Sequence, residues 1–315
     1  MTIRRTLVRW YKRHRRDLPW RRTSDPYAIW VSEIMLQQTR VAAVIPYFER
    51  FLQRFPRVEH LAAASETEVL SLWSGLGYYS RARNMQKAAR QIVKSGAFPR
   101  DFASIRELAG VGDYTAAAIA SIAFGLPHAA IDGNVRRVIL RLAGDSDADV
   151  GAIATQLLAR RHPGRWNQAL MELGAVVCLP REPLCAVCPL ATHCQARVKG
   201  IQGQIPPPKK KPAVIRKERV LLVIRRKGRI LLVPSSRVSG FWELPELSPG
   251  AFSGVRLGPS LGTFRHAITN SLYYFEVREA RSVAHPRECR WWDSSKLGEI
   301  TLSTAAKKAL RCLKD

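Results

Sequence analysis

The feature that most constrains the fold is a change of sequence character near residue 200, which divides the chain into two parts. Before it, apolar residues recur every three or four positions, and this period predicts a series of short helices. At residues 206–212 the run PPPKKKP favours an extended, solvated spacer. After it, runs rich in β-branched residues predict strands. We therefore expect a helical domain at 1–200, a linker at 201–215 and an α+β domain at 216–315.

The second part contains a hairpin signature. Two apolar runs at residues 220–224 and 229–233 flank a short turn that carries Lys227 and Gly228. Residues 272–277 predict another strand, and residues 303–313 predict a closing helix. These elements define the α+β class of the domain.

The chain is strongly basic, with 51 lysines and arginines against 25 acids and a formal net charge of +26 over 315 residues. Such an excess indicates a polyanionic partner, either a nucleic acid or an anionic membrane surface. A generally basic, soluble protein is the less specific alternative. The longest uncharged run, residues 115–131, is short of the ~20 residues that span a bilayer. The N-terminus lacks the apolar core of a secretory signal, and residues 1–16 predict a basic amphipathic helix.

Four of the six cysteines lie within 17 residues in the pattern C-x6-C-x2-C-x5-C. Clustered cysteines in a chain without a secretory signal are typical of metal or cluster ligands. Four thiolates can hold Zn²⁺ or a 4Fe–4S cube. Structural zinc usually binds two close pairs separated by a longer arm, so this spacing favours the cube, but the residues alone leave both open. The ligands would be Cys178, Cys185, Cys188 and Cys194.

Two further segments carry candidate functional residues. Gly110, Val111 and Gly112 form a Gly-x-Gly turn before a helix of small residues, where backbone N–H groups can bind a phosphate. Eighteen residues after Tyr114 comes Asp132, at a predicted helix start. Taken alone, such a turn is most often only a turn, and such an aspartate is most often a helix cap.

Glu33 lies in an otherwise apolar helical segment, residues 27–39. A half-exposed acid in a surface ion pair is one interpretation. However, Trp30, Ile34 and Gln37 should share its face of the helix, and partial burial raises the pKa of a carboxyl group. A carboxyl group that carries a proton near neutral pH can act as a general acid.

Together these segments resemble the iron–sulfur branch of the helix-hairpin-helix DNA glycosylases, and within it the MutY-type adenine glycosylases. The resemblance covers residues 1–200 almost continuously and is carried by segments 17–21, 27–39, 73–84, 108–116, 131–137 and 167–175 and by the cysteine spacing. It implies a 4Fe–4S cluster on the four cysteines, in the loop 178–194. It also implies that Glu33 protonates adenine and that Asp132 stabilises positive charge on the sugar, with Tyr114 and Asn134 in support.

The resemblance assigns the remaining site residues as well. The adenine pocket would be lined by Leu18, Trp20, Arg21 and Gln168. The DNA-binding residues would be Leu36, Gln38, Tyr78, Gly110, Val111, Gly112 and Thr269. The hairpin departs from the usual pattern of these enzymes, because Ala109 replaces a proline.

Tyr114 decides between two chemistries. Bifunctional relatives carry at this position a lysine that forms a Schiff base with the sugar and cuts the strand, which tyrosine cannot do. We therefore expect a monofunctional glycosylase that removes adenine mispaired with 8-oxoguanine or guanine in duplex DNA. The alternatives are an endonuclease III-like pyrimidine glycosylase/lyase and a non-catalytic iron–sulfur DNA-binding protein. We further expect a monomer in the cytoplasm, associated with the nucleoid and not with a membrane.

The second domain resembles the Nudix-like C-terminal domain of these glycosylases through residues 238–246. No run of glutamates that could bind metal is present, so pyrophosphohydrolase activity is not expected. The family's lesion-sensing loop aligns with residues 265–270. There Thr269 keeps a hydroxyl group, whereas Ile268 and Asn270 replace an aromatic ring and an imidazole. The sequence therefore does not predict the relative preference for 8-oxoguanine and guanine.

Overall fold

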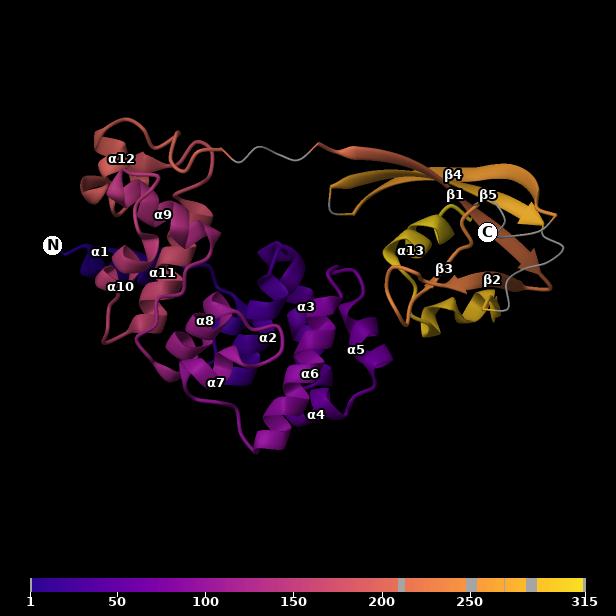
Figure 1. Ribbon diagram of the computed structural model, residues 1–315, viewed down its shortest axis with the longest axis horizontal. Coiled ribbons are helices and arrows are strands. Elements are labelled where there is room, and N and C mark those ends of the chain that lie inside the picture. The colour runs from indigo at the N-terminus through magenta and orange to yellow at the C-terminus, as the bar shows by residue number, and fades with distance from the viewer. Residues whose placement is uncertain (1, 209–212, 248–253, 269, 282–287, 314–315) are drawn as a thin grey trace. The chain divides into compact units, whose positions relative to one another are not determined.

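The computed structural model describes residues 2–208, 213–247, 254–268, 270–281 and 288–313. Up to residue 208 the described chain is helical, as its periodicity predicts. Its helices are α1 Ile3–His14, α2 Pro26–Leu36, α3 Val41–Arg54, α4 Val58–Ala63, α5 Glu66–Trp73, α6 Ser80–Ser95, α7 Phe102–Arg106, α8 Asp113–Phe124, α9 Gly133–Ala143, α10 Val150–Leu157, α11 Pro163–Val176 and α12 Gln195–Val198, with short 3-10 turns at Pro19–Arg21, Cys185–Val187 and Ala191–His193 (Figure 1).

The chain divides into two compact units. The first, helical unit comprises Met1–Ala64 and Ser80–Lys209. The second comprises Ser65–Tyr79 and Lys210–Asp315. The domain boundaries expected from the sequence remain a prediction. No helix of the described residues is long and apolar enough to cross a bilayer.

Helix α2 forms the centre of the helical unit. Its start is set by Asp25, whose carboxylate accepts hydrogen bonds from the backbone N–H groups of Tyr27 and Ala28, and by Pro26 in the first turn. The nine residues 27–35 are all buried, because the helix is apolar on nearly every side. A carboxyl group on this helix, such as that of Glu33, is therefore removed from water.

Helices α8 and α11 pack closely because small residues line their contacts. A Cβ atom on Gly164 of α11 would lie 2.5 Å from the carbonyl oxygen of Ser121 in α8. Gly174, near the other end of α11, similarly faces the start of α9, where an added Cβ would lie 2.6 Å from the Cβ of Asn134. Such close approach allows residues from different helices to meet around one cavity.

The second unit contains a mixed sheet. Its strands are β1 Ile215–Arg226, β2 Arg229–Pro234, β3 Trp242–Glu243, β4 Arg256–Ile268, β5 Ser271–Arg281 and β6 Arg290–Asp293, followed by a 3-10 turn at Ser294–Glu299 and helix α13 Thr304–Leu310. The strand order is β3-β2-β1-β5-β4, with β6 paired to β2. Strands β1 and β5 are parallel, and the other named pairs are antiparallel.

The predicted hairpin is confirmed. Arg226 and Arg229 face each other across the turn, and Lys227 and Gly228 both have positive φ, at 47° and 72°. Positive φ at both central residues is the geometry that a two-residue turn needs to match the twist of its strands. The strand at 272–277 and the C-terminal helix are also present, as parts of β5 and α13.

The sequence did not indicate β3, β4 or β6. Strand β4 contains Gly258, Pro259 and Gly262, which disfavour a strand, and its pairing with β5 is irregular between Leu257 and Gly262. It forms because β5 provides a partner along most of its length. On one face of the sheet, α13 packs through Ala305, Ala306 and Ala309 against a core that includes Phe275 and Val277 (Figure 1).

Candidate active site

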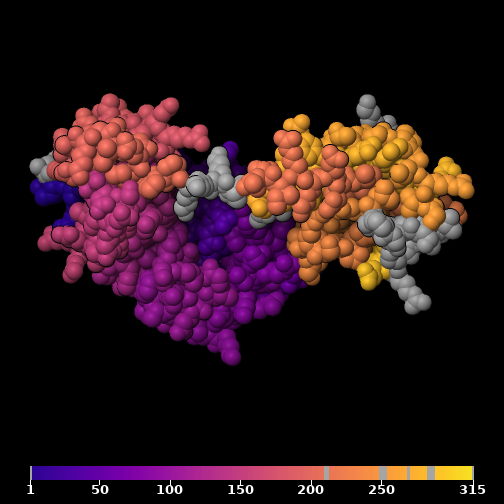
Figure 2. Space-filling model, turned by 45° about the horizontal axis from the view of Figure 1, so that its top comes forward, coloured from indigo at the N-terminus to yellow at the C-terminus, as the bar shows by residue number. Residues whose placement is uncertain are grey.

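A cavity of about 580 Å³ lies within the helical unit. Figure 2 shows indigo, N-terminal atoms of this unit in a hollow between its magenta and purple surfaces. The cavity is lined by Arg16, Leu18, Trp20, Arg21, Glu33, Leu36, Gln37, Gln38, Thr39, Val41, Tyr114, Asp132, Asn134, Gln168, Met171, Glu172 and Ala175. All four predicted catalytic residues and all four predicted adenine-pocket residues are among them, so the helix packing brings these side chains together.

Glu33 faces this cavity from the buried helix α2 with an exposed fraction of 6 %. Burial raises its pKa to about 7, and the negative charge of Asp132 acts in the same direction. The Tyr114 hydroxyl donates a hydrogen bond to Glu33 Oε2 at 2.8 Å, which lowers the pKa, as does the charge of Arg21. The balance leaves a carboxyl group that can hold or release a proton near neutral pH. The surface ion pair considered from the sequence does not form.

Asp132 is the N-cap of α9, as the simplest interpretation of the sequence predicts, and it also faces the cavity. One of its oxygens accepts the backbone N–H of Val135 at 2.7 Å, and the other accepts the Asn134 side-chain amide at 3.0 Å. The amide oxygen of Asn134 in turn accepts Arg137 Nη2 at 2.9 Å. Both oxygens of the carboxylate are thus fixed by neighbours while it borders the cavity.

The segment after α2 is held in a strained shape at the cavity. Gln38 has a φ of 55°, a left-handed conformation that a glutamine rarely adopts and that costs ~1–3 kcal/mol. The buried guanidinium group of Arg81 supports this turn by donating to the carbonyl oxygens of Ile34, Met35 and Gln37. Such strain persists only where the surroundings enforce it, and it often marks a functional position.

The Gly-x-Gly hairpin lies between α7 and α8, outside the cavity lining. Gly110 has a φ of 78°, and an added Cβ there would lie 2.8 Å from the Cβ of Asn84. Val111 is buried, and Gly112 is the N-cap of α8, without a side chain that caps the helix. No side chain therefore caps the first N–H groups of α8, and the phosphate-binding role expected of this turn stays a prediction.

The four clustered cysteines line one small cavity of about 20 Å³, together with the buried Arg141. All four are free thiols. Burial raises the pKa of the Cys188 thiol to about 11. No three His, Cys, Asp or Glu side chains of the described chain lie close enough to bind one metal ion. A cube does not require that closeness, because each thiolate binds a different iron.

Comparison with known proteins places this architecture in a family. Residues 31–161 match the HhH-GPD superfamily of base excision DNA repair proteins. The adenine DNA glycosylase of Buchnera aphidicola subsp. Baizongia pistaciae (strain Bp) is 36 % identical over 247 residues, which cover 76 % of this chain and 70 % of the relative. The chain belongs to the adenine DNA glycosylase family.

Longer members of this family match over a smaller share of their length. The human adenine DNA glycosylase is 47 % identical over 222 residues, but the match covers 64 % of this chain and only 41 % of the human protein. The match to the mouse enzyme likewise covers 43 % of that protein. The chain thus spans about two fifths of these mammalian relatives.

Solved structures outside the adenine glycosylase family share the helical fold. A thermostable thymine-DNA glycosylase is 31 % identical with a TM-score of 0.59, and the match covers 62 % of this chain and 94 % of that one. The protein in a non-covalent endonuclease III–DNA complex is 25 % identical with a TM-score of 0.55, covering 64 % and 97 % of the two chains. These matches fit the predicted fold of the helical part.

The structure adds residues to the cavity of the helical unit that the sequence did not single out. The most informative is Glu172 of α11, which is fully buried and bonded to Arg16 and Arg21. A glutamate inside the apolar run 169–175 was the available signal. Met171 also lies beside Tyr114, with its sulfur 3.7 Å from the Tyr114 hydroxyl.

The other predicted DNA-binding residues lie only partly in this cavity. Leu36 and Gln38 line the cavity, but Tyr78 does not; it lies between α5 and α6 with a φ of 49° and an exposed fraction of 48 %. Thr269 lies outside the described residues. Its neighbour Asn270, directly before the start of β5, is exposed.

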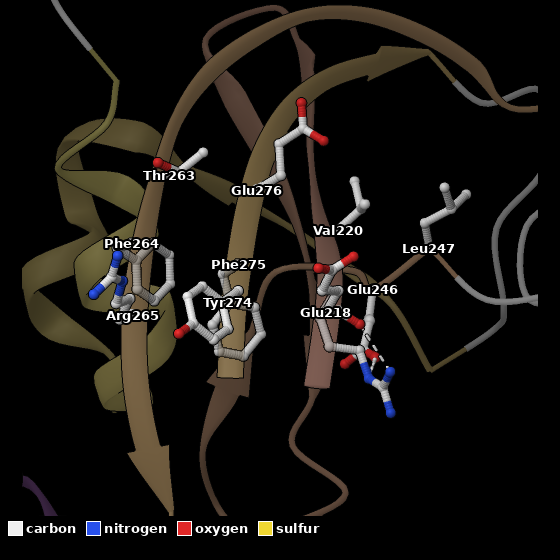
Figure 3. Close-up of a pocket in the computed structure, with 11 residues that line it drawn as sticks. Glu218, Val220, Glu246, Leu247, Thr263, Phe264, Arg265, Tyr274, Phe275 and Glu276 are labelled. Atoms are coloured by element: carbon white, nitrogen blue, oxygen red, sulfur yellow. Dashed lines mark hydrogen bonds and ion pairs between the residues drawn. The ribbon is translucent and has the colours of Figure 1, made fainter. Parts of the chain in front are cut away.

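A larger cavity of about 870 Å³ lies on the sheet of the second unit (Figure 3). It is lined from strands β1, β4 and β5 by Glu218, Tyr274, Arg265 and their neighbours. Arg265 begins the segment aligned with the lesion-sensing loop, but none of the described catalytic, adenine-pocket or cysteine residues predicted from the sequence is among them. At its edge Arg219 Nε lies 2.6 Å from Glu246 Oε1. The cavity of the helical unit, where acid and carboxylate converge, is therefore the candidate active site despite its smaller volume.

Proposed function

We propose that the protein is a monofunctional adenine DNA glycosylase that excises adenine mispaired with 8-oxoguanine or guanine. The observation that carries the proposal is Glu33, a buried carboxyl group with a pKa of about 7 that shares one cavity with Asp132. Two carboxyl groups with different environments can divide the roles of acid and charge stabiliser. The names of the family's members support adenine as the base.

The chemistry follows from the two carboxyl groups. An adenine extruded from the duplex enters the cavity. Protonated Glu33 gives its proton to the base, which makes the base a better leaving group. The ionised Asp132, fixed by Asn134 and the start of α9, stabilises the positive charge that develops on the sugar. Water completes the hydrolysis.

Tyr114 supports the monofunctional assignment over the glycosylase/lyase alternative. Its hydroxyl is hydrogen-bonded to Glu33, and burial raises its pKa well above the ordinary value, so it remains neutral. A phenol cannot form a Schiff base with the sugar, and this position carries no amine that could. A non-catalytic iron–sulfur DNA-binding protein would not require a buried glutamate whose pKa is raised to about 7.

We propose that Cys178, Cys185, Cys188 and Cys194 hold a 4Fe–4S cluster. The chemistry of the site fits it, because the buried guanidinium group of Arg141 donates to Cys178 Sγ at 3.3 Å and otherwise to the carbonyl oxygens of Leu179, Pro180 and Ile205. A buried cation is costly unless negative charge lies close by, and cluster thiolates would supply that charge. When bound, the cluster would stabilise the loop 178–194, since its binding energy is folding energy.

We propose that the protein acts as a monomer on duplex DNA in the cytoplasm, at the nucleoid. The hairpin of Gly110–Gly112 would bind a backbone phosphate, and Gln38, held with positive φ, would occupy the space left by the extruded adenine. Leu36 would contact the mispair, and Tyr78 would stack beside the oxidised guanine. The second unit would act as a Nudix-like lesion-recognition domain, with residues 265–270 as its sensing segment. The first four of these residues belong to strand β4, whereas the resemblance predicts a loop.

The test is a single-turnover excision assay on duplexes that contain adenine opposite 8-oxoguanine, guanine or cytosine. We expect base release from the first two, and an intact strand until alkali is added. Glu33→Gln, whose amide group cannot protonate the base, serves as the negative control. Strand cleavage by the wild type at the rate of base release would favour the lyase, and the absence of excision from all three duplexes would contradict the enzyme.

A further inference from the structure

Glu172 of α11 lines the cavity but takes no part in the proposed proton transfer or charge stabilisation. Its Oε1 accepts two hydrogen bonds from Arg16, one from the backbone N–H and one from Nε, both at 2.9 Å. Its Oε2 accepts Arg16 Nη2 at 2.8 Å and Arg21 Nη2 at 2.7 Å. One fully buried carboxylate thus clamps two guanidinium groups that both line the cavity.

Glu172 remains ionised at any working pH. Burial alone would raise its pKa, but the hydrogen bonds from Arg16 and Arg21 bring it to about 2. It is therefore a constant negative charge in the wall of the cavity, unlike Glu33, which titrates near neutrality.

The charged residues that line the cavity balance one another. The cations are Arg16 and Arg21, and the carboxyl groups are Glu33, Asp132 and Glu172. When Glu33 carries its proton, the two cations meet two carboxylates, and the lining is neutral. Without Glu172 the lining would carry a net positive charge while a positive charge develops on base and sugar. In a site with little water, like charges repel strongly.

The clamp also reaches the residues that would contact the base. The Arg21 guanidinium lies over the ring of Tyr11, 5.4 Å from its centre. The Tyr11 hydroxyl donates to the side-chain oxygen of Gln168 at 2.9 Å. Since Arg21 belongs to the same turn as Trp20, fixing Arg21 also fixes that wall of the cavity.

We propose that Glu172 is a positioning residue that holds Arg16 and Arg21 in the wall of the base pocket and cancels their charge, so that the pocket tolerates a cationic transition state. The proposal rests on the proposed glycosylase function. It differs from a structural salt bridge, because it requires an electrostatic effect on Glu33. The groups that act directly on the pKa of Glu33 are Tyr114 from α8, Asp132 from the start of α9 and Arg21 from the turn before α2. Glu172 and Arg16 act on it through Arg21, because Glu172 cancels the charge of Arg21 and Arg16 shares the same carboxylate.

The experiment uses variants with opposite charge effects. Glu172→Gln removes one negative charge and leaves Arg21 uncompensated near Glu33. Arg16→Gln removes one positive charge at a side chain that is 37 % exposed, and so folds more readily. The double variant restores the original net charge of the pocket. The matched control is Asp17→Asn, which removes an exposed, ion-paired carboxylate from the same segment outside the cavity.

The measurement is the single-turnover excision rate from pH 5 to 9 on a duplex with adenine opposite 8-oxoguanine, below the melting temperature of each variant. For Glu172→Gln we expect a rate about tenfold lower at neutral pH and a midpoint of the alkaline decline about one unit lower, the scale of one nearby charge. Arg16→Gln should move the midpoint upward. The double variant should return it to the wild-type value, and Asp17→Asn should leave it in place.

Midpoints that do not move in either single variant would overturn the proposal and leave a structural salt bridge. The same holds if the double variant fails to restore the midpoint. If Glu172→Gln does not fold, the upward shift in Arg16→Gln decides the question. A wild type that excises no adenine would instead contradict the proposed function, so the two failures can be distinguished.

Discussion

Replacing Tyr114 by phenylalanine should move the pH dependence of excision to higher pH. The Tyr114 hydroxyl donates to Glu33 Oε2 at 2.8 Å and thereby favours the ionised carboxylate, against the effect of burial. Phenylalanine keeps the ring and removes this donor. With the hydrogen bond lost, burial acts unopposed by Tyr114, and the pKa of Glu33 should rise above its present value of about 7.

The size of the shift follows from the hydrogen bond. A bond to a charged group contributes about 1.5–3 kcal/mol, and one pKa unit corresponds to about 1.4 kcal/mol. The pKa of Glu33 should therefore rise by about one to two units. Since the acid must be protonated to act, the rate falls as pH rises through its pKa. The alkaline decline of the variant should then be centred near pH 8–9 instead of 7.

Single-turnover excision rates from pH 5 to 10 give this midpoint independently of the maximal rate. The matched control is Tyr27→Phe, which removes a buried hydroxyl that donates to the carbonyl oxygen of Phe55, outside the cavity. The control should keep the wild-type midpoint. A Tyr114→Phe midpoint that is unchanged or lower would refute the assignment of Glu33 as the titrating acid.

Four further outcomes are expected. Glu33→Gln should bind the mispaired duplex but release no adenine. Because the pKa of Glu33 is about 4.5 unfolded and about 7 folded, the wild type loses stability as the pH rises through this range, whereas the variant does not. In denaturant titrations the variant should therefore be more stable than the wild type by up to about 3 kcal/mol at pH 8, and no more stable at pH 4. Arg137→Met should lose about 1–3 kcal/mol or more in the same titrations, because the buried carbonyl oxygen of Gly174 and the part-buried carbonyl oxygen of Cys178 lose their donor. A loss under about 1 kcal/mol would show that water replaces the guanidinium group. The Cys188→Ser variant should contain less iron than the about four atoms per chain expected of a cube. Stoichiometric zinc in the wild type after anaerobic purification would exclude the cluster. Tyr114→Lys should form an adduct that borohydride traps, whereas equal trapping by the wild type would contradict the monofunctional assignment.

Much of the fold could be predicted from the sequence because its signals are local. The helical period before residue 200 and the turn at Lys227–Gly228 each depend on a few neighbouring residues, and both are confirmed. The N-cap at Asp132 is of the same kind. Strand β4 was not predicted because its glycines and proline disfavour a strand. It forms because its backbone pairs with β5, a partner that the local sequence does not reveal.

The candidate site divides in the same way. Segment motifs pointed to Glu33, Asp132 and Tyr114 one at a time, but the sequence did not state that Tyr114, 81 residues from Glu33, donates to it. The pKa of about 7 exists only because α2 is buried on all sides by other helices. A carboxyl pKa depends on surrounding charge and water, which a linear pattern does not specify.

What the sequence by itself determined is the class of each part, the cysteine spacing and the chemical types available for catalysis, since these are set by residue identity and short separations. What only the tertiary structure decided is which of these groups meet. Glu172 and Arg16 lie 156 residues apart, and their contact depends on the packing of α11 beside the segment after α1. The small residues that let α11 pack against α8 and against the start of α9, Gly164 and Gly174, act through volume, and their effect appears only when the helices come together.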